Sequence, residues 1–107
     1  MQEKFTVTLK FKVLAKKEWD SLNPAIRDKF AKVLKKRSTS YEALTMPGNR
    51  LSLQHNCYKI KLRNDGYRLA YTVISDEKGR IKVTVTVVAV DRRDEIYDDL
   101  QKRLTEK

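Results

Sequence analysis

The chain has 107 residues, 40% of them hydrophobic and 36% charged, and its 24 Lys and Arg against 14 Asp and Glu give a formal net charge of +10. This length fits one small domain, residues 1–107, with no apolar run of membrane-spanning length and no signal-peptide pattern, so we expect a cytoplasmic protein without a membrane partner. The charge excess favours a polyanionic partner, either nucleic acid or an acidic protein.

A metal or disulfide site finds little support in the sequence. The single cysteine, Cys57, excludes an internal disulfide, and with the single histidine, His55, it lacks the spacing of zinc ligands. We therefore interpret these residues as a buried thiol and a loop imidazole, and we expect no metal and no cofactor.

The first third of the chain predicts a strand followed by two helices. Apolar and polar residues alternate over residues 5–13, which is typical of a half-exposed strand. Residues 14–22 change to helical spacing. The Asn23-Pro24 pair then matches an N-cap followed by proline in the first turn, and the second helix is expected to end near Lys36 or Arg37, where basic residues suit the helix dipole.

The remainder predicts a loop, three strands and a helix. Residues 38–56 are rich in turn-forming residues and predict a long connection with one helical turn around Tyr41 to Leu44. The order β-α-α-β-β-β-α predicts an α+β domain with helices packed against a mostly antiparallel sheet. The three strands are expected at about residues 57–63, 67–75 and 80–90, the last of them central, and the final helix over residues 92–104.

The first predicted hairpin carries a row of cations. Because side chains alternate along a strand, Lys59, Lys61 and Arg63 face one way while their apolar neighbours face the core. The Asp65-Gly66 pair predicts a two-residue loop, which would put Arg63 opposite Arg68 on the face of the lysines. Like charges opposite one another destabilise a sheet by roughly a few tenths of a kcal/mol each. We therefore interpret this face as a binding or catalytic surface.

Three segments resemble the RelE branch of the RelE/ParE toxin superfamily. They are "CYKIKLRNDGYRLAYTV" (57–73), "VVAVDRRDEIY" (87–97) and "AKKEW" (15–19), in the same order and at similar spacing as in that family. The resemblance implies a RelE-like microbial RNase fold and the toxin of a type II toxin–antitoxin pair. It further implies a metal-independent endoribonuclease that enters the A site of the 70S ribosome, cuts mRNA there, and is restrained by a RelB-like antitoxin.

The resemblance also implies the site residues. Matched position by position, the catalytic set is Lys59, Lys61, Arg68, Arg93 and Tyr97, with Arg92 as the alternative to Arg93. Two features depart from the family pattern, because Asp91 replaces the usual glycine and the stretch from Arg93 to Tyr97 is shorter. We interpret Asp91 as the N-cap of the final helix. A third departure lies at Ser52 and Leu53, where relatives often carry a basic residue and a glycine, and Arg50 is expected to supply the missing charge.

This set can be assigned to cleavage of RNA by its own 2′-OH. The reaction needs a base for the hydroxyl, stabilisation of charge at phosphorus, and an acid for the leaving 5′-oxygen. Since the single histidine lies outside the cationic face, we expect Lys61 to be the base, its pKa lowered by neighbouring cations, with Lys59 assisting it or holding the phosphate. Arg68 would stabilise the charge at phosphorus, and Tyr97 would stack a base. Arg93 would act at the leaving oxygen as stabiliser or proton donor, and electrostatic support is preferred because arginine gives up a proton slowly.

Two other functions remain open. A ParE-like toxin would inhibit DNA gyrase without cutting RNA, although that branch generally lacks the lysine pair found here at Lys59 and Lys61. A non-catalytic nucleic-acid-binding module would need only positive charge, and it predicts graded effects of Lys-to-Ala changes with steep salt dependence. Catalysis instead predicts one or two changes that abolish activity without changing affinity. Whether the protein cleaves RNA or only binds it, further cations are expected to contact RNA phosphates: Arg63, Arg92, Arg50, Lys35, Lys36 and Arg37.

Overall fold

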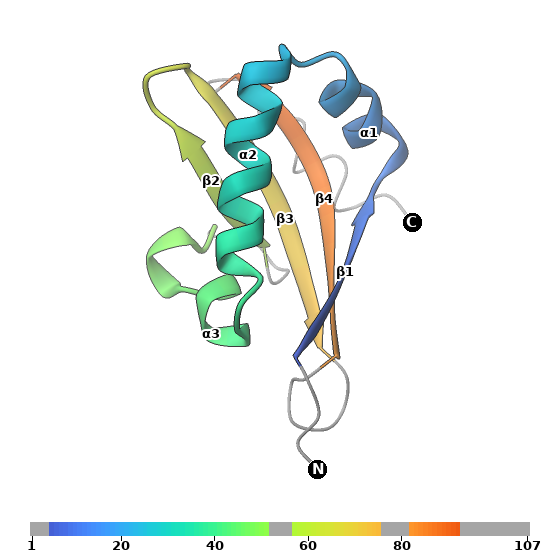
Figure 1. Cartoon of the computed structure of the whole chain (residues 1–107), viewed down its shortest axis with the longest axis vertical. Helices are drawn as coiled ribbons and strands as arrows, with labels where there is room; N and C mark the ends of the chain where they lie inside the picture. The colour runs from blue at the N-terminus through green and yellow to red at the C-terminus, as the bar shows by residue number, and fades with distance from the viewer. Residues whose placement is uncertain (1–4, 52–56, 76–81, 93–107) are drawn as a thin grey trace.

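The protein forms a four-stranded sheet with its long helix packed on one face (Figure 1). The computed structural model describes residues 5–51, 57–75 and 82–92, and no helix within these ranges is long and apolar enough to cross a membrane. The predicted α+β class is confirmed, and so is the helical turn after the second helix. The elements are β1 (Thr6–Phe11), α1 (Val13–Asp20), α2 (Pro24–Arg37), α3 (Tyr41–Leu44), the 3-10 turn η1 (Pro47–Asn49), β2 (Cys57–Leu62), β3 (Tyr67–Ser75) and β4 (Lys82–Arg92).

Helix α2 begins and ends as its sequence predicts. The Asn23 side chain accepts a hydrogen bond of 2.9 Å from the backbone N–H of Ala25, and Pro24 occupies the first turn, where its missing N–H would have no partner in the helix. Phe30 and Leu34 are one turn apart and are buried in the core. The last turn is basic, which suits the negative end of the helix dipole.

The strand order across the sheet is β1-β4-β3-β2. Strand β4 lies in the centre as predicted, parallel to β1 and antiparallel to β3, while β2 forms the far edge, antiparallel to β3. The sheet is therefore mixed, and its two antiparallel pairings fit the predicted mostly antiparallel arrangement. A β-bulge interrupts the β3–β4 ladder, because Ala70 pairs with Ala89 and Tyr71 with Val87, which makes Val88 the extra residue of the bulge.

The two faces of the sheet are packed differently. One face carries the main core with α1 and α2, and its largest fully buried side chains include Tyr71, Phe30 and Ile60. Val88 and Ala89 of β4 are consecutive, yet both belong to the second face. Strict alternation would place them on opposite faces, and the bulge explains why it does not. That second side holds a smaller buried cluster: Leu51, Cys57, Ala70, Val88 and Ala89.

The predicted two-residue hairpin loop is wrong. Leu62 pairs with Tyr67, so the loop contains the four residues 63–66. The carbonyl of Leu62 accepts hydrogen bonds from the N–H groups of Asp65 at 3.2 Å and Gly66 at 2.9 Å. Asp65 also forms an ion pair of 2.8 Å with Lys29 of α2. The longer loop thus gains backbone bonds and a tertiary contact that local turn preferences do not contain.

The predicted helix start at Arg92 is also wrong. Strand β4 runs through Arg92, and its last two residues pair with the first two of β3, Asp91 with Arg68 and Arg92 with Tyr67. These pairings continue the β3–β4 ladder to Arg92, so Asp91 is a strand residue and not an N-cap. The rest of the predicted final helix lies outside the described residues.

Candidate active site on the hairpin

A row of charged residues crosses three strands near the hairpin loop. Lys61 on β2 lies opposite Arg68 on β3, and Arg68 lies opposite Asp91 on β4. Residues paired in this way point to the same face of a sheet, and here that is the face away from α2. The row therefore consists of two cations followed by a carboxylate.

Lys59 lies one step further along the same face of β2. Its partner on β3 is Ala70, which in turn pairs with Ala89 on β4, and both alanines are fully buried. Lys59 therefore stands beside small side chains, whereas Lys61 stands beside an arginine. The predicted pairing of Arg63 with Arg68 is wrong, because Arg63 belongs to the four-residue loop.

The loop determines which cations meet. Gly66 has a φ of 73°, a left-handed conformation that glycine adopts without strain. With four residues in the loop, the register moves by two residues from the predicted one, and a shift of two leaves every side chain on its expected face. The prediction of a shared cationic face is therefore confirmed for Lys59, Lys61 and Arg68, although their partners differ.

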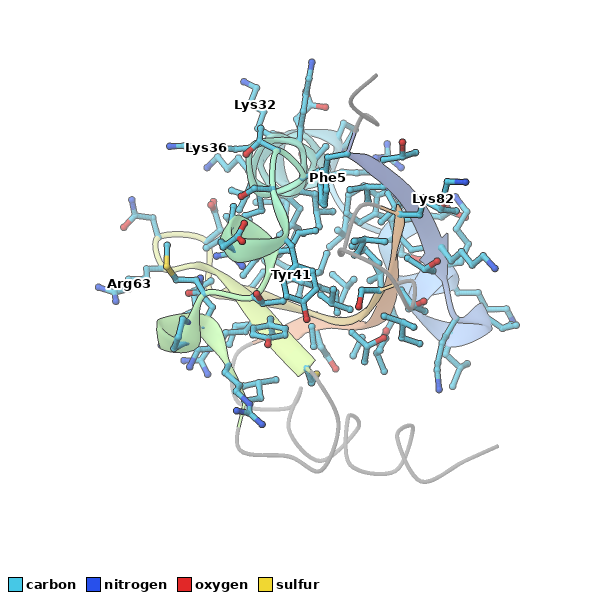
Figure 2. All side chains as sticks on the ribbon, turned by 90° about the horizontal axis from the view of Figure 1, so that it is seen from below. Phe5, Lys32, Lys36, Tyr41, Arg63 and Lys82 are labelled. Atoms are coloured by element: carbon cyan, nitrogen blue, oxygen red, sulfur yellow. The ribbon has the colours of Figure 1, made fainter. Side chains whose placement is uncertain are left out.

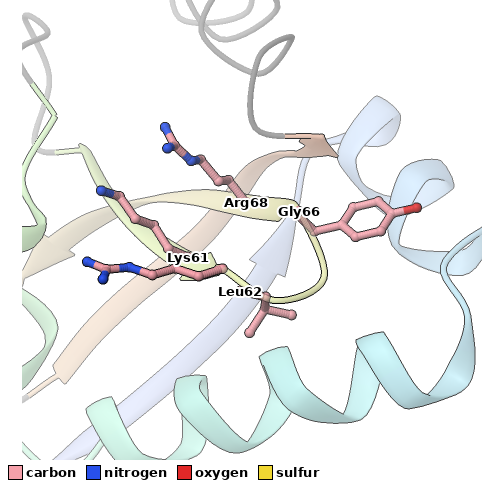
Figure 3. A pocket seen from close by; sticks show the side chains of 6 residues that line it. Lys61, Leu62, Gly66 and Arg68 are labelled. Carbon is pink, nitrogen blue, oxygen red and sulfur yellow. The ribbon is translucent and has the colours of Figure 1, made fainter.

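Lys61 and Arg68 border a pocket of about 250 Å³ (Figure 3). In this view both side chains extend to the same side of the sheet, whereas Leu62 points toward α2. Cationic donors beside an open pocket suit an anionic group such as a phosphate. The lining residues are Lys61, Leu62, Arg63, Gly66, Tyr67 and Arg68.

The pKa of Lys61 is lowered from its usual value. The largest cause is the positive charge of Lys59, and a side-chain hydrogen bond with Lys59, some loss of hydration and the charges of Arg68 and Arg63 act in the same direction. A lower pKa increases the fraction of neutral amine near neutral pH, and the neutral amine is the form that accepts a proton. The direction agrees with the expectation from the sequence.

Comparison with known proteins identifies the family. A family model described as the ParE toxin of the type II toxin–antitoxin system parDE matches residues 9–97. The mRNA interferase toxin RelE of Escherichia coli strain K12 is 39% identical over 101 residues, covering 90% of this chain and 95% of that protein. The chain belongs to the RelE branch of the RelE/ParE toxin superfamily.

Solved structures of RelE share the fold of this RelE-type toxin. A free-state structure of E. coli RelE with two arginines replaced by alanine has a TM-score of 0.71 at 33% identity, covering 96% of this chain and 99% of that one. A chain of the intact E. coli RelBE toxin–antitoxin complex has a TM-score of 0.62 at 36% identity, covering 78% and 93%. The family and the fold predicted from the sequence are thereby confirmed.

The cations predicted to bind phosphates lie at different depths in this RelE-type toxin. Lys35, Lys36, Arg50 and Arg63 are exposed, and Figure 2 shows Lys36 and Arg63 pointing outward from α2 and from the hairpin loop. Arg37 is half-buried, and its Nη1 donates hydrogen bonds to other parts of the protein. Phosphate binding by these residues stays a prediction.

Part of the predicted catalytic set falls outside the described residues, namely Arg93 and Tyr97, and so does His55. Arg92 is described only by its backbone in β4, opposite Tyr67. The structure of this RelE-type toxin therefore brings together Lys59, Lys61 and Arg68. Within residues 5–51, 57–75 and 82–92, no three His, Cys, Asp or Glu side chains are grouped so as to hold a metal ion.

Asp91 is the site residue that sequence reasoning missed. Its place in the row follows from strand β4 continuing past Val90 and from the bulge at Val88, which changes the phase of the alternation. The run Val87–Val90 contains the signal, since four apolar residues in succession fit a strand in which a β-bulge interrupts the alternation of faces. The RelE-type toxin thus carries a carboxylate on its cationic face.

Proposed function

We propose that this RelE-type toxin is a ribosome-dependent mRNA endoribonuclease that inhibits translation. The observation that carries the proposal is the pair Lys61 and Arg68, opposite one another beside a pocket, with Lys59 lowering the pKa of Lys61. Similarity to proteins of E. coli and Shigella flexneri named mRNA interferase RelE supports it.

Lys61 acts as the general base in this proposal. Its neutral amine takes the proton of the 2′-OH, the 2′-oxygen forms a bond to the adjacent phosphorus, and the bond from phosphorus to the 5′-oxygen breaks. The 5′-oxygen takes up a proton from water as it leaves, and Lys61 returns its proton to solvent afterwards. The products are a 2′,3′-cyclic phosphate and a 5′-hydroxyl. Lys59, as an ammonium group, attracts the phosphate and favours the neutral form of Lys61.

Arg68 stabilises the negative charge that develops at phosphorus. A guanidinium donates hydrogen bonds in a planar fork that matches two phosphate oxygens, and opposite positions on adjacent strands bring Arg68 close to Lys61. Arg93, or Arg92 in its place, supports the leaving 5′-oxygen electrostatically. Tyr97 stacks a base and thereby helps to align the 2′-oxygen, the phosphorus and the 5′-oxygen.

The proposed partners are the 70S ribosome, its A-site mRNA, and a RelB-like antitoxin. The net charge of +10 and the exposed cations Lys35, Lys36 and Arg63 support binding to rRNA phosphates. Similarity to the E. coli RelBE toxin–antitoxin complex supports restraint by an antitoxin. Since ribosomes are its target, this toxin acts in the cytoplasm.

The test is cleavage of a defined mRNA, both naked and on programmed ribosomes, with mapping of the cut and of the new 3′ end. We expect a cut within the A-site codon, only on ribosomes, that leaves a 2′,3′-cyclic phosphate. Inhibition of DNA gyrase with no cut would favour the ParE-like function. RNA binding with steep salt dependence and no cut would favour the non-catalytic module.

A further inference from the structure

Arg37 connects the end of α2 to the backbone of the strand that carries the lysine pair. Its Nη1 donates a hydrogen bond of 2.8 Å to the carbonyl oxygen of Lys59 and one of 3.1 Å to the hydroxyl of Tyr71. The guanidinium carbon also lies 5.9 Å from the centre of the Tyr71 ring, within the range of a cation–π contact. A helix residue thus binds the main chain of β2 at one of the two lysines.

The carbonyl that Arg37 binds lies on the open edge of the sheet. Because β2 is an edge strand, every second carbonyl points away from β3 and needs a partner elsewhere. The carbonyl of Cys57 is the preceding one of this series, and it accepts a hydrogen bond of 2.9 Å from the N–H of Leu51. Two successive outward carbonyls of β2 are therefore held in place before Lys61.

This edge geometry also describes how Lys61 meets Arg68. Residues whose carbonyls point outward form the narrow pairs of an antiparallel ladder, with Cα atoms about 4.5 Å apart. By alternation Lys61 belongs to the same series as Lys59, so its pairing with Arg68 is a narrow one. The position of the Lys59 main chain consequently sets the spacing of the three cations.

Tyr71 extends the contacts of Arg37 into the core. Its side chain is fully buried, it stacks on Tyr58 with ring centres 5.9 Å apart, and its hydroxyl donates a hydrogen bond of 2.8 Å to the carbonyl of Leu44. The network therefore joins α2, α3, β2 and β3. Polar networks whose members all have partners favour a single arrangement of the elements they connect.

We propose that Arg37 is a positioning residue for the lysine pair, which holds the backbone of Lys59 so that the spacing between Lys59, Lys61 and Arg68 is kept. The inference rests on the proposed function. It differs from the phosphate contact predicted from the sequence, because Lys35 and Lys36 in the same turn are exposed, while Arg37 is half-buried and directs Nη1 to protein oxygens.

Variants separate positioning from phosphate binding. Arg37→Met keeps an unbranched stem without donors, Arg37→Lys keeps a charge and a donor, and Tyr71→Phe keeps the buried ring without its hydroxyl. Lys36→Ala removes an exposed neighbouring charge, and Arg27→Ala removes a half-buried arginine of the same helix as a matched control. Each variant is measured for thermal midpoint, ribosome affinity across a salt series, and the single-turnover cleavage rate at saturating ribosomes as a function of pH.

We expect Arg37→Met to lower the saturated cleavage rate by about 10-fold to 100-fold, because small displacements of catalytic groups have effects of this size. The cleavage rate of this variant should rise at a higher pH than that of the parent, since the pKa of Lys61 returns toward its usual value when Lys59 moves away. Arg37→Lys should recover part of the rate, and Tyr71→Phe should shift the profile in the same direction by less. Ribosome affinity should fall no further than in Arg27→Ala.

The opposite pattern overturns the inference. If Arg37→Met loses affinity as Lys36→Ala does, with the parent's saturated rate and pH profile, Arg37 is a phosphate contact. If Arg37→Met does not fold, parent-like pH profiles in Arg37→Lys and Tyr71→Phe overturn the inference, and shifted profiles support it. A titration of the Lys61 side chain by NMR in the free toxin needs no cleavage. There, a higher Lys61 pKa in the Arg37 variants supports positioning even if the proposed function fails, and an unchanged pKa overturns it.

Discussion

Arg68 lies directly opposite Asp91 in the β3–β4 ladder, so a carboxylate faces the arginine that stabilises the phosphate in the proposed reaction. An RNA phosphate that reaches Arg68 must also approach Asp91, and like charges repel. Both residues are half-buried, where salt screens such interactions less than on the open surface. Asp91 is therefore expected to weaken anion binding on this face.

Asp91→Asn should strengthen binding of the toxin to RNA and ribosomes. Removing one negative charge near the phosphate site relieves a repulsion on the order of 1 kcal/mol, so we expect affinity at low salt to rise about threefold to tenfold. Titrations in a salt series measure this. Asp28→Asn removes an equal charge from the exposed surface of α2 and should change affinity less. Weaker binding in Asp91→Asn would instead assign Asp91 to holding Arg68 in place.

Gly66→Ala should destabilise the toxin through its hairpin loop. Gly66 has a φ of 73°, and a Cβ at this position would meet no atom within 4 Å, so the expected cost of about 1 kcal/mol is purely conformational. Gly48→Ala is the matched control, because a Cβ there also meets nothing and its φ is not positive. Urea unfolding of the two variants compares their free energies of unfolding, and equal values would contradict the expectation.

Local patterns predicted most elements, because alternation and capping are properties of neighbouring residues. Helix α2 starts at the pair Asn23-Pro24 as expected, and the turn at Tyr41–Leu44 was also anticipated. Local patterns do not predict the hairpin register, because the Asp65-Gly66 pair by itself favours a two-residue loop. The four-residue loop is accompanied by an ion pair between Asp65 and Lys29, and a contact between residues so far apart in the chain is not visible in a local pattern.

The same limit applies to the candidate site. The cationic face followed from alternation alone, but the partners of its residues depend on how strands pair. Asp91 joins the row only because β4 continues and is bulged at Val88. Likewise, three consecutive cations end α2, and only the position of the β2 edge shows that Arg37 is the one that turns inward.

The thiol of Cys57 should be almost unreactive in the folded toxin. Burial is the largest cause that raises its pKa, from 9.0 to about 12, and its side chain is fully buried. Three pH units correspond to about 10³-fold less thiolate, so alkylation by iodoacetamide at pH 8 should be slower than in urea by at least about that factor. Comparable alkylation rates in the two states would show that the thiol is accessible.

Lys61→Ala and Lys61→Arg should both lower the saturated cleavage rate by about 10²-fold to 10⁴-fold, the usual range for loss of a general base. Arginine keeps the positive charge but does not release its proton near neutral pH, so it should bind ribosomes and fail to cleave. Single-turnover cleavage and ribosome binding are measured in parallel. Lys82→Arg makes the same substitution at another exposed lysine of a strand, and it serves as the control for a general effect of replacing lysine by arginine. A near-parental rate in Lys61→Arg would make Lys61 an electrostatic contact.

Lys59→Gln should move the rise in cleavage rate to higher pH. The charge of Lys59 is the largest cause of the lowered pKa of Lys61, so removing it raises that pKa and leaves less neutral Lys61 at neutral pH. The rate should therefore fall most near neutrality and approach the parental rate as the pH passes the new pKa. Lys59→Arg keeps the charge and should keep the parental profile.

Arg63→Gln provides a comparison for Lys59→Gln, because the charge of Arg63 is the smallest of the causes that lower the pKa of Lys61. Its profile should shift in the same direction as that of Lys59→Gln but by less. Rates measured under single-turnover conditions, together with an NMR titration of Lys61 in the free toxin, give the two shifts independently. Equal shifts in Lys59→Gln and Arg63→Gln would mean that the net charge of the face, and not the neighbouring ammonium group, sets the pKa of Lys61.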